Sequence, residues 1–271
     1  MLVLFLCLFL SNAYKVLNMS EKFSPKEKFQ KVFYPLLYLL SVVVFVLSGT
    51  YIFNTLYYTK IYVNGDSMAP TLIGNASQRV HYGICDNHDS ALQSLKRFDV
   101  VITLYPDSWT ADKETYKIKR VWAFPGETIS LDEYKNPETK KTQYKFTATK
   151  DNTTTYQIIG TAVKKEFNTY GEIITVKFTT PNKTFYTKIG SSSEITTHRE
   201  FENLSLDKNN KEYFLMGDNW TDSSDSYSNL DKGERITYKN LKGRVVAIQG
   251  TAKLVDKTLV DIDTKDAKTI F

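Results

Sequence analysis

Residues 116–126 read YKIKRVWAFPG and predict a β-strand that ends in a tight turn. The first half alternates, so that Tyr116, Ile118 and Arg120 point one way while Lys117, Lys119 and Val121 point the other. A lysine in such a strand commonly lies at a solvated edge. The apolar run that follows and the closing Pro-Gly pair favour a more buried setting. This stretch indicates a β-fold with a lysine near its core.

Other short apolar runs on either side of this stretch have the same character. They are rich in β-branched and aromatic residues and are separated by Gly, Pro, Asn and Asp, as is typical of an all-β domain. The runs are Lys60 to Val63, Phe98 to Tyr105, Glu212 to Met216 and Arg244 to Gln249. We therefore assign residues 59–131 and 211–254 to one β core.

Residues 132–210 differ in composition, being rich in Thr, Lys and Asn. Alternating stretches such as Tyr156 to Val163 and Glu172 to Thr179 predict an inserted antiparallel β subdomain. The charged tail, residues 255–271, is compatible with either a final strand or a loose end.

A long uncharged run precedes the β core. No charged residue occurs from Val32 to Tyr58, and at about 1.5 Å per residue a helix of this length crosses a hydrocarbon core of roughly 30 Å. A buried core helix is the alternative, but such helices are usually shorter and amphipathic. We predict a transmembrane helix over 32–58, with Pro35 in its first turn.

The distribution of lysines predicts the orientation of this span. Lys22, Lys26, Lys28 and Lys31 precede it, whereas Lys60 is the only basic residue just after it. Positive charge favours the cytoplasmic side, so residues 1–31 are expected in the cytoplasm and the β core outside the cell membrane. Residues 1–18 suggest a misplaced start, with Met19 as the expected one. A second tilted segment is the alternative.

Composition excludes several classes of protein. The net charge of +5 is too weak to indicate a nucleic-acid partner, and two cysteines, Cys7 and Cys85, cannot build a disulfide framework or a cysteine-rich metal site. The neighbours of Cys85 predict that it lies in a polar loop. We expect no cofactor and no metal.

One serine lies in a turn soon after the membrane segment. The stretch NGDSMAPT, residues 64–71, holds Ser67 between Gly65 and Pro70. Alone, this pattern is usually a turn with local hydrogen bonds. His81, His88 and His198 lie in polar, loop-like stretches without a pattern typical of a Ser-His-Asp triad, so a lysine is the remaining candidate base.

Together, four clusters resemble the conserved boxes of bacterial type I signal peptidases, the Ser/Lys peptidases of family S26. These are SMAPT at 67–71, RFDVV at 97–101, KRVWAFPG at 119–126 and GDNWTDSSDS at 217–226. The resemblance covers roughly residues 32–131 and 212–250. It implies a signal-peptidase-like β-fold, with Ser67 as nucleophile, Lys119 as general base and Ser223 orienting the lysine amine.

The resemblance also implies supporting roles in the loop after residue 216. Arg120 is expected to pair with Asp225, and Gly217, Asp218 and Asn219 to shape the start of the loop. The family usually has Arg, Asn and Arg where this chain has Trp220, Asp222 and Tyr227. Gly65, two residues before the serine, resembles the Gram-positive-like branch and leaves the Ser67 backbone N–H as the one nameable oxyanion donor.

The function expected from the resemblance is removal of signal peptides from exported preproteins at the membrane surface. A desolvated lysine can lose its proton near neutral pH and act as a base without metal or cofactor. An extended peptide would add to a strand edge, with small residues preferred before the cut, as in an A-x-A site. Substrate-binding residues are not identifiable from the sequence.

Three alternatives accompany this interpretation. One is a self-cleaving regulator with a DNA-binding module, for which no helix-turn-helix precedes Ser67. Another is a catalytically silent membrane scaffold, although both Ser67 and Lys119 are present. A third is a specialised peptidase for pilin-like or other surface proteins, which the large insertion favours.

Overall fold

The computed structural model describes residues 24–75, 79–111, 114–168, 171–190, 201–256 and 258–269. Residues 1–18, where a different start is predicted, lie outside these ranges, as does His198. The chain divides into two units, Met1–Leu56 and Tyr57–Phe271. Each unit is considered separately below.

The described residues of the first unit belong to one long helix, α2 (Pro25–Tyr57), after Ser24. It begins earlier than predicted because Ser24 and Glu27 form a capping box: the Glu27 N–H donates to Ser24 Oγ, and the Ser24 N–H donates to the Glu27 carboxylate. Pro35 therefore lies inside the helix and not in its first turn, which corrects the prediction. Within α2, Phe33–Tyr57 is long and apolar enough to span a membrane.

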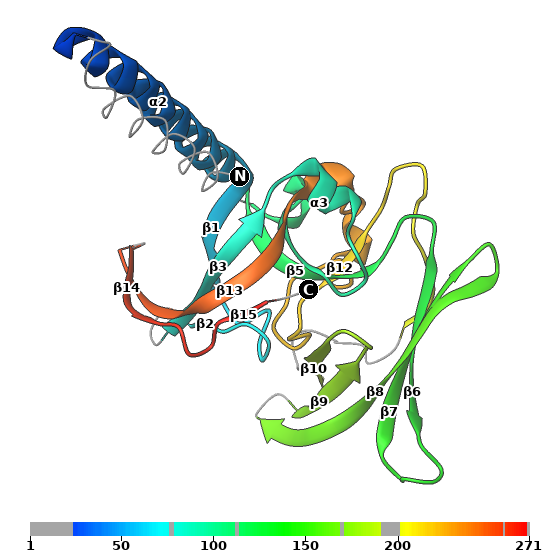
Figure 1. Cartoon of the computed structure of the whole chain (residues 1–271). Coiled ribbons are helices and arrows are strands. Elements are labelled where there is room, and N and C mark those ends of the chain that lie inside the picture. Colours follow the sequence, from blue (N-terminus) through cyan, green and yellow to red (C-terminus); the bar gives the residue numbers. More distant parts are fainter. Residues whose placement is uncertain are drawn as a thin grey trace. The chain divides into compact units, whose positions relative to one another are not determined.

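The second unit is mostly β. Its larger sheet has nine strands among the described residues, in the order β1-β3-β13-β4-β5-β12, with β2 beside β3 and both β14 and β15 beside β13. Strand β13 pairs antiparallel with β3 despite their separation in sequence, and β3 pairs with β1 (Figure 1). The strands are β1 (Tyr58–Tyr62), β2 (Gly74–Asn75), β3 (Arg79–Asp86), β4 (Val100–Leu104), β5 (Tyr116–Ala123), β12 (Phe214–Met216), β13 (Leu241–Val255), β14 (Thr258–Asp263) and β15 (Lys268–Thr269).

A second antiparallel sheet is built from the middle of the chain. It has six strands in the described part, in the order β10-β9-β8-β7-β6-β11. They are β6 (Thr128–Lys135), β7 (Thr142–Lys150), β8 (Thr153–Asn168), β9 (Gly171–Thr179), β10 (Thr184–Gly190) and β11 (Phe201–Ser205). The predicted β character is confirmed for the described part of residues 132–210, and β6 starts slightly before that stretch.

Helical turns in the second unit are short. They are α3 (Asp89–Gln93), η1 (Asp107–Trp109), η2 (Leu230–Lys232) and η3 (Tyr238–Asn240). His88 caps the N-terminus of α3, where its side chain accepts a hydrogen bond from the Ser90 N–H.

The largest apolar cluster joins residues of both sheets. Trp122 on β5 is fully buried, and its ring makes edge-on contacts with Phe146, Phe178, Phe185 and Trp220. Such aromatic pairs add about 0.5–1.5 kcal/mol each beyond the burial of their apolar area. Because β5 also carries the candidate lysine, this packing fixes the strand on which that lysine stands.

Two sequence interpretations need correction. His81 and Cys85 lie in strand β3, not in polar loops, and both are buried. The run RVHYGICD alternates only weakly because His, Cys and Gly occupy inward positions, so its strand character was missed. The charged tail does form strands, since β14 and β15 both pair with β13.

Candidate active site

Lys119 is buried in strand β5. Its side chain is 1% exposed, whereas Lys117, two residues earlier on the same strand, is exposed. The two lysines differ in exposure because β5 passes from the surface into the core, between residues 118 and 123. The lysine near the core that the alternation indicated is therefore confirmed as a buried side chain.

The pKa of Lys119 is lowered to about 8, chiefly by burial and to a lesser extent by the positive charge of Lys117, while Asp225, Asp218 and Asp222 act in the opposite direction. A charged ammonium loses hydration in the apolar site, which favours the neutral amine. At pH 7 a group with this pKa is about one-tenth neutral, compared with less than about one-thousandth for an ordinary lysine.

Ser67 lies in the loop between β1 and β2, half-buried at the wall of a groove of about 500 Å³ that Lys119 also lines. Gly65, at the start of this loop, has a φ of 93°, which favours glycine, and its N–H donates to the Gly74 carbonyl at 2.9 Å. On the other side of Ser67, Met68 and Leu72 are fully buried. The loop is thereby closed at its base and anchored in the core.

The loop after β12 meets the serine loop directly. The Asn219 N–H donates to the Ser67 carbonyl at 3.0 Å, and the Asn219 side-chain amide donates to the Asp66 carbonyl at 3.2 Å. Gly217 permits the approach: a Cβ at this position would lie 2.3 Å from the Ser67 carbonyl oxygen and 2.4 Å from Ser223 Oγ. Glycine is required here by space, because no side-chain carbon fits between these oxygens.

Ser223 and Asp225 face the buried lysine. Lys119 Nζ donates to Ser223 Oγ at 2.9 Å, and the Ser223 hydroxyl hydrogen-bonds to the Asp225 carboxylate. Burial raises the pKa of Asp225, while Lys119, Ser223 and backbone N–H groups, including those of Ser228 and Gly217, act to lower it. A lysine, a hydroxyl and a carboxyl group thus form one buried chain of polar contacts.

The predicted pairing of Arg120 with Asp225 is wrong. The Arg120 guanidinium makes a bidentate contact with Asp218, at 2.7 Å from Nε and 2.5 Å from Nη2, and its Nη1 donates to the Phe98 carbonyl at 2.8 Å. Both charged side chains are almost fully buried. Arg120 and Lys119 are neighbours on one strand and point to opposite faces, so they meet different carboxylates of the loop.

The second sheet also supports this loop, through main-chain contacts that have no sequence signature. The Lys188 N–H on β10 donates to the Asp218 carbonyl at 2.7 Å, and the Trp220 N–H donates to the Lys188 carbonyl at 2.9 Å. Residues 218–220 therefore extend the edge of the six-stranded sheet. Backbone pairing leaves no trace in residue type, so sequence reasoning could not find it.

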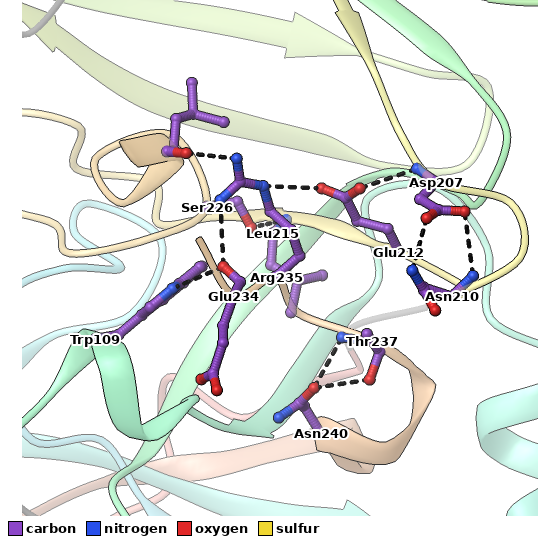
Figure 2. Close-up of polar contacts among 11 residues, drawn as sticks. Trp109, Asp207, Asn210, Glu212, Leu215, Ser226, Glu234, Arg235, Thr237 and Asn240 are labelled. Atoms are coloured by element: carbon purple, nitrogen blue, oxygen red, sulfur yellow. Dashed lines mark hydrogen bonds and ion pairs between the residues drawn. The ribbon is translucent and has the colours of Figure 1, made fainter. Parts of the chain in front are cut away.

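A polar network holds the C-terminal end of the loop after β12 (Figure 2). The Leu215 N–H donates to Ser226 Oγ at 3.0 Å, which links the two ends of the loop. Further along, Arg235 forms an ion pair with Glu212 at 3.4 Å, and Glu212 accepts from the Asp207 N–H at 2.9 Å. These contacts hold β12 and the loop that carries Ser223 and Asp225 in place.

Among the described residues, no group of three or more His, Cys, Asp or Glu side chains could hold a metal ion. The polar groups that converge on the groove are instead a serine, a lysine and the hydroxyl and carboxyl groups behind the lysine. Such a set can supply a nucleophile and a base of lowered pKa.

Comparison with known proteins gives one family. Residues 36–249 match the model of the family described as signal peptidase, peptidase S26. No curated protein matches the chain in a search of such sequences. The family match spans most of α2, the six-stranded sheet, the larger sheet as far as residue 249 of β13, and the groove with Ser67 and Lys119. The chain therefore belongs to the S26 family of signal peptidases.

Proposed function

We propose that this signal peptidase is a membrane-anchored serine endopeptidase in which Ser67 is the nucleophile and Lys119 the general base. The observation that carries the proposal is the buried Lys119, whose pKa is lowered to about 8 by burial and which lines the same groove as Ser67. Ser223, Asp225 and Arg120 are proposed as supporting residues, the last through Asp218.

In the proposed reaction the neutral amine of Lys119 takes the Ser67 proton as Oγ attacks the scissile carbonyl carbon. The C–N bond then breaks, Lys119 gives the proton to the leaving amine, and the substrate acyl group remains as an ester on Ser67. Lys119 next takes a proton from water, which attacks the ester and releases the second product, and the proton returns to Ser67. The Ser67 N–H is the proposed oxyanion donor.

Two strand edges border the groove and favour an extended peptide as substrate. Strand β1 is at the end of the larger sheet, and residues 116–119 of β5 precede the part of that strand paired with β12. A second groove of about 550 Å³ continues from the first, because Tyr62 and Ile118 line both. Main-chain pairing along these edges would hold a signal peptide with small residues before the cut.

The proposed arrangement of the chain has α2 crossing the cell membrane, the N-terminus in the cytoplasm and the β unit outside. Lys26, which precedes the apolar part of the helix, supports this orientation. Residues 59–131 with 211–254 are proposed as the catalytic core and residues 132–210 as the insertion. Gly65, which stands two residues before Ser67 in place of a hydroxyl residue, is the basis for proposing a Gram-positive-like site.

The test is cleavage of a preprotein carrying an A-x-A site by the detergent-solubilised full chain. Ser67→Ala and Lys119→Ala are expected to abolish cleavage, whereas Lys150→Ala, at an exposed position on β7, is the control that keeps it. If the folded wild-type protein cuts none of several preproteins, the general role fails, and a specialised peptidase or a silent scaffold replaces it. If Lys119→Ala remains active, the base is another group.

A further inference from the structure

His81 contacts both ends of the loop that carries Ser67 and is not among the residues that line the groove. It is 5% exposed and sits in β3, opposite Thr251 of β13. The proposed reaction does not use it. A buried imidazole outside the candidate catalytic group is therefore held directly against the segment on which the nucleophile stands.

Three hydrogen bonds connect His81 to the two ends of this loop. At one end, the Val63 N–H donates to the His81 carbonyl at 2.9 Å. At the other, the His81 N–H donates to the Ile73 carbonyl at 2.8 Å, and the Ile73 N–H donates to the imidazole Nδ1 at 2.8 Å. One residue thus closes the loop at its base, and its side chain makes one of the three contacts.

The side-chain contact sets the state of the ring. To accept at Nδ1, the imidazole must be neutral and carry its proton on Nε2. If Nδ1 were protonated, two N–H groups would face each other, and the part-buried hydrogen bond from the Ile73 N–H would break. The lost hydrogen bond and the two opposed N–H groups would both destabilise this end of the loop.

We propose that His81 is a positioning residue for Ser67: the neutral imidazole holds Ile73 and thereby fixes the loop that presents the nucleophile to Lys119. The proposal rests on the proposed role of Ser67. Other contacts hold the same loop at different points, since Asn219 binds the Ser67 carbonyl and Lys268 Nζ donates to the Thr71 carbonyl at 3.1 Å. Of these contacts, the one made by the His81 imidazole is the one that proton uptake would break.

The surroundings of the ring favour its neutral form. Burial lowers the pKa of His81 below its ordinary value, and the positive charge of Lys268 lowers it further. The carboxylate of Asp266 acts in the opposite direction. Both charged groups belong to the C-terminal segment, whereas Thr251, opposite on β13, carries no charge. The contact with Ile73 is therefore intact at neutral pH and breaks only in acid.

Two substitutions at His81 distinguish a role in positioning the Ser67 loop from a role in packing alone. The side chain introduced by His81→Asn keeps a hydrogen-bond acceptor at the position of Nδ1 and cannot titrate. The side chain introduced by His81→Leu has nearly the volume of histidine but no acceptor. If His81 only filled space, Leu would serve at least as well as Asn, because it buries no polar group. The proposal predicts the reverse order, with kcat of the Leu variant at least about tenfold below that of Asn and KM within about twofold.

The experiment measures preprotein cleavage by the full-length wild-type, Asn and Leu proteins in detergent, below their unfolding temperatures. In acid, log(kcat/KM) of the wild type should fall by more than one per pH unit, because both Lys119 and His81 take up a proton. For the Asn variant it should fall by about one per pH unit, from Lys119 alone. Equal kcat values for the two variants, a more active Leu variant, or a wild-type slope unchanged by Asn would each overturn the proposal.

Amide hydrogen exchange distinguishes this failure from failure of the proposed function. Exchange at Ile73 and across residues 64–73 should be slow in the wild type and the Asn variant, and faster in the Leu variant. If the wild type cleaves no preprotein, the proposed function fails, and the exchange result still decides whether the imidazole holds the loop. Equal exchange in the Asn and Leu variants would overturn the positioning role.

Discussion

Lys119 Nζ lies 2.9 Å from Ser223 Oγ, although the two residues are far apart in sequence and belong to a strand and a loop. The contact places a hydroxyl beside the amine of a lysine that is 1% exposed. It limits rotation of the lysine side chain, and the hydroxyl in turn contacts Asp225. The amine is therefore both desolvated and held in direction, which are the two properties a lysine base requires.

Ser223→Ala should lower kcat about 10- to 100-fold with little change in KM, because the amine loses its orienting partner while the groove keeps its shape. Ser223→Thr keeps the hydroxyl and should recover a large part of the activity. Steady-state kinetics on one preprotein provide the comparison. An alanine variant with wild-type kcat would show that Ser223 does not orient the base.

The pH dependence of cleavage should follow the neutral form of Lys119. With a pKa of about 8, kcat/KM should rise about tenfold per pH unit below that value and level off above it. The sign follows from the role, since a base works only when deprotonated. A pH–rate profile measures this directly, and activity that is flat from pH 6 to pH 9 contradicts the assignment.

Lys119→Met should make the protein more stable at neutral pH while abolishing cleavage. The lysine pKa falls from 10.5 to about 8 on folding, so the unfolded chain binds more protons between these values. Its burial therefore costs about 3 kcal/mol below pH 8, and this cost disappears as the pH rises toward 10.5. The variant's gain in unfolding temperature should be largest below pH 8 and should fade above pH 10.

If the gain in unfolding temperature of Lys119→Met stayed constant from pH 7 to pH 10.5, it would arise from packing and not from the charge of Lys119. Lys150→Met, at an exposed position, serves as the matched control and should change the unfolding temperature little at any pH.

Gly217→Ala should inactivate the enzyme through geometry. The new Cβ would meet the Ser67 carbonyl and Ser223 Oγ at distances that atoms do not tolerate, so the serine loop and the loop after β12 must separate. We expect a loss of kcat of about 100-fold or more. Gly49→Ala, where nothing lies within 4 Å of the added carbon, is the control that should retain activity. Full activity of Gly217→Ala would mean that the two loops need not touch.

Removal of one member of the Arg120–Asp218 pair should destabilise the fold by about 3–5 kcal/mol, because the remaining charge is buried without a partner. Arg120→Met combined with Asp218→Leu should cost less than the two single changes added together. Unfolding temperatures of the four proteins test this coupling. Strictly additive losses would show that the pair is not coupled. Asp225→Asn should leave the Arg120 coupling intact, since Asp225 does not bind this arginine.

Local sequence patterns predicted much of the fold. The alternation over residues 116–126 predicted β5, and the runs before and after it predicted β1, β4, β12 and β13. Strand β3 was missed because a histidine, a cysteine and a glycine occupy positions that a simple apolar pattern does not recognise. The start of α2 was misplaced because Ser24 and Glu27 begin the helix well before its apolar part.

The sequence by itself determined that this protein is a β-rich S26 signal peptidase preceded by a helix that could span a membrane. The β-rich character and the long apolar helix follow from periodicity and length along short stretches, whereas the family follows from the resemblance of four motifs and from the family match. Tertiary structure decided which carboxylate meets Arg120, how His81 closes the serine loop, and how β10 supports residues 218–220. Such contacts join residues distant in sequence, and several use only the backbone, so the packing of the two sheets selects them and the residue pattern does not.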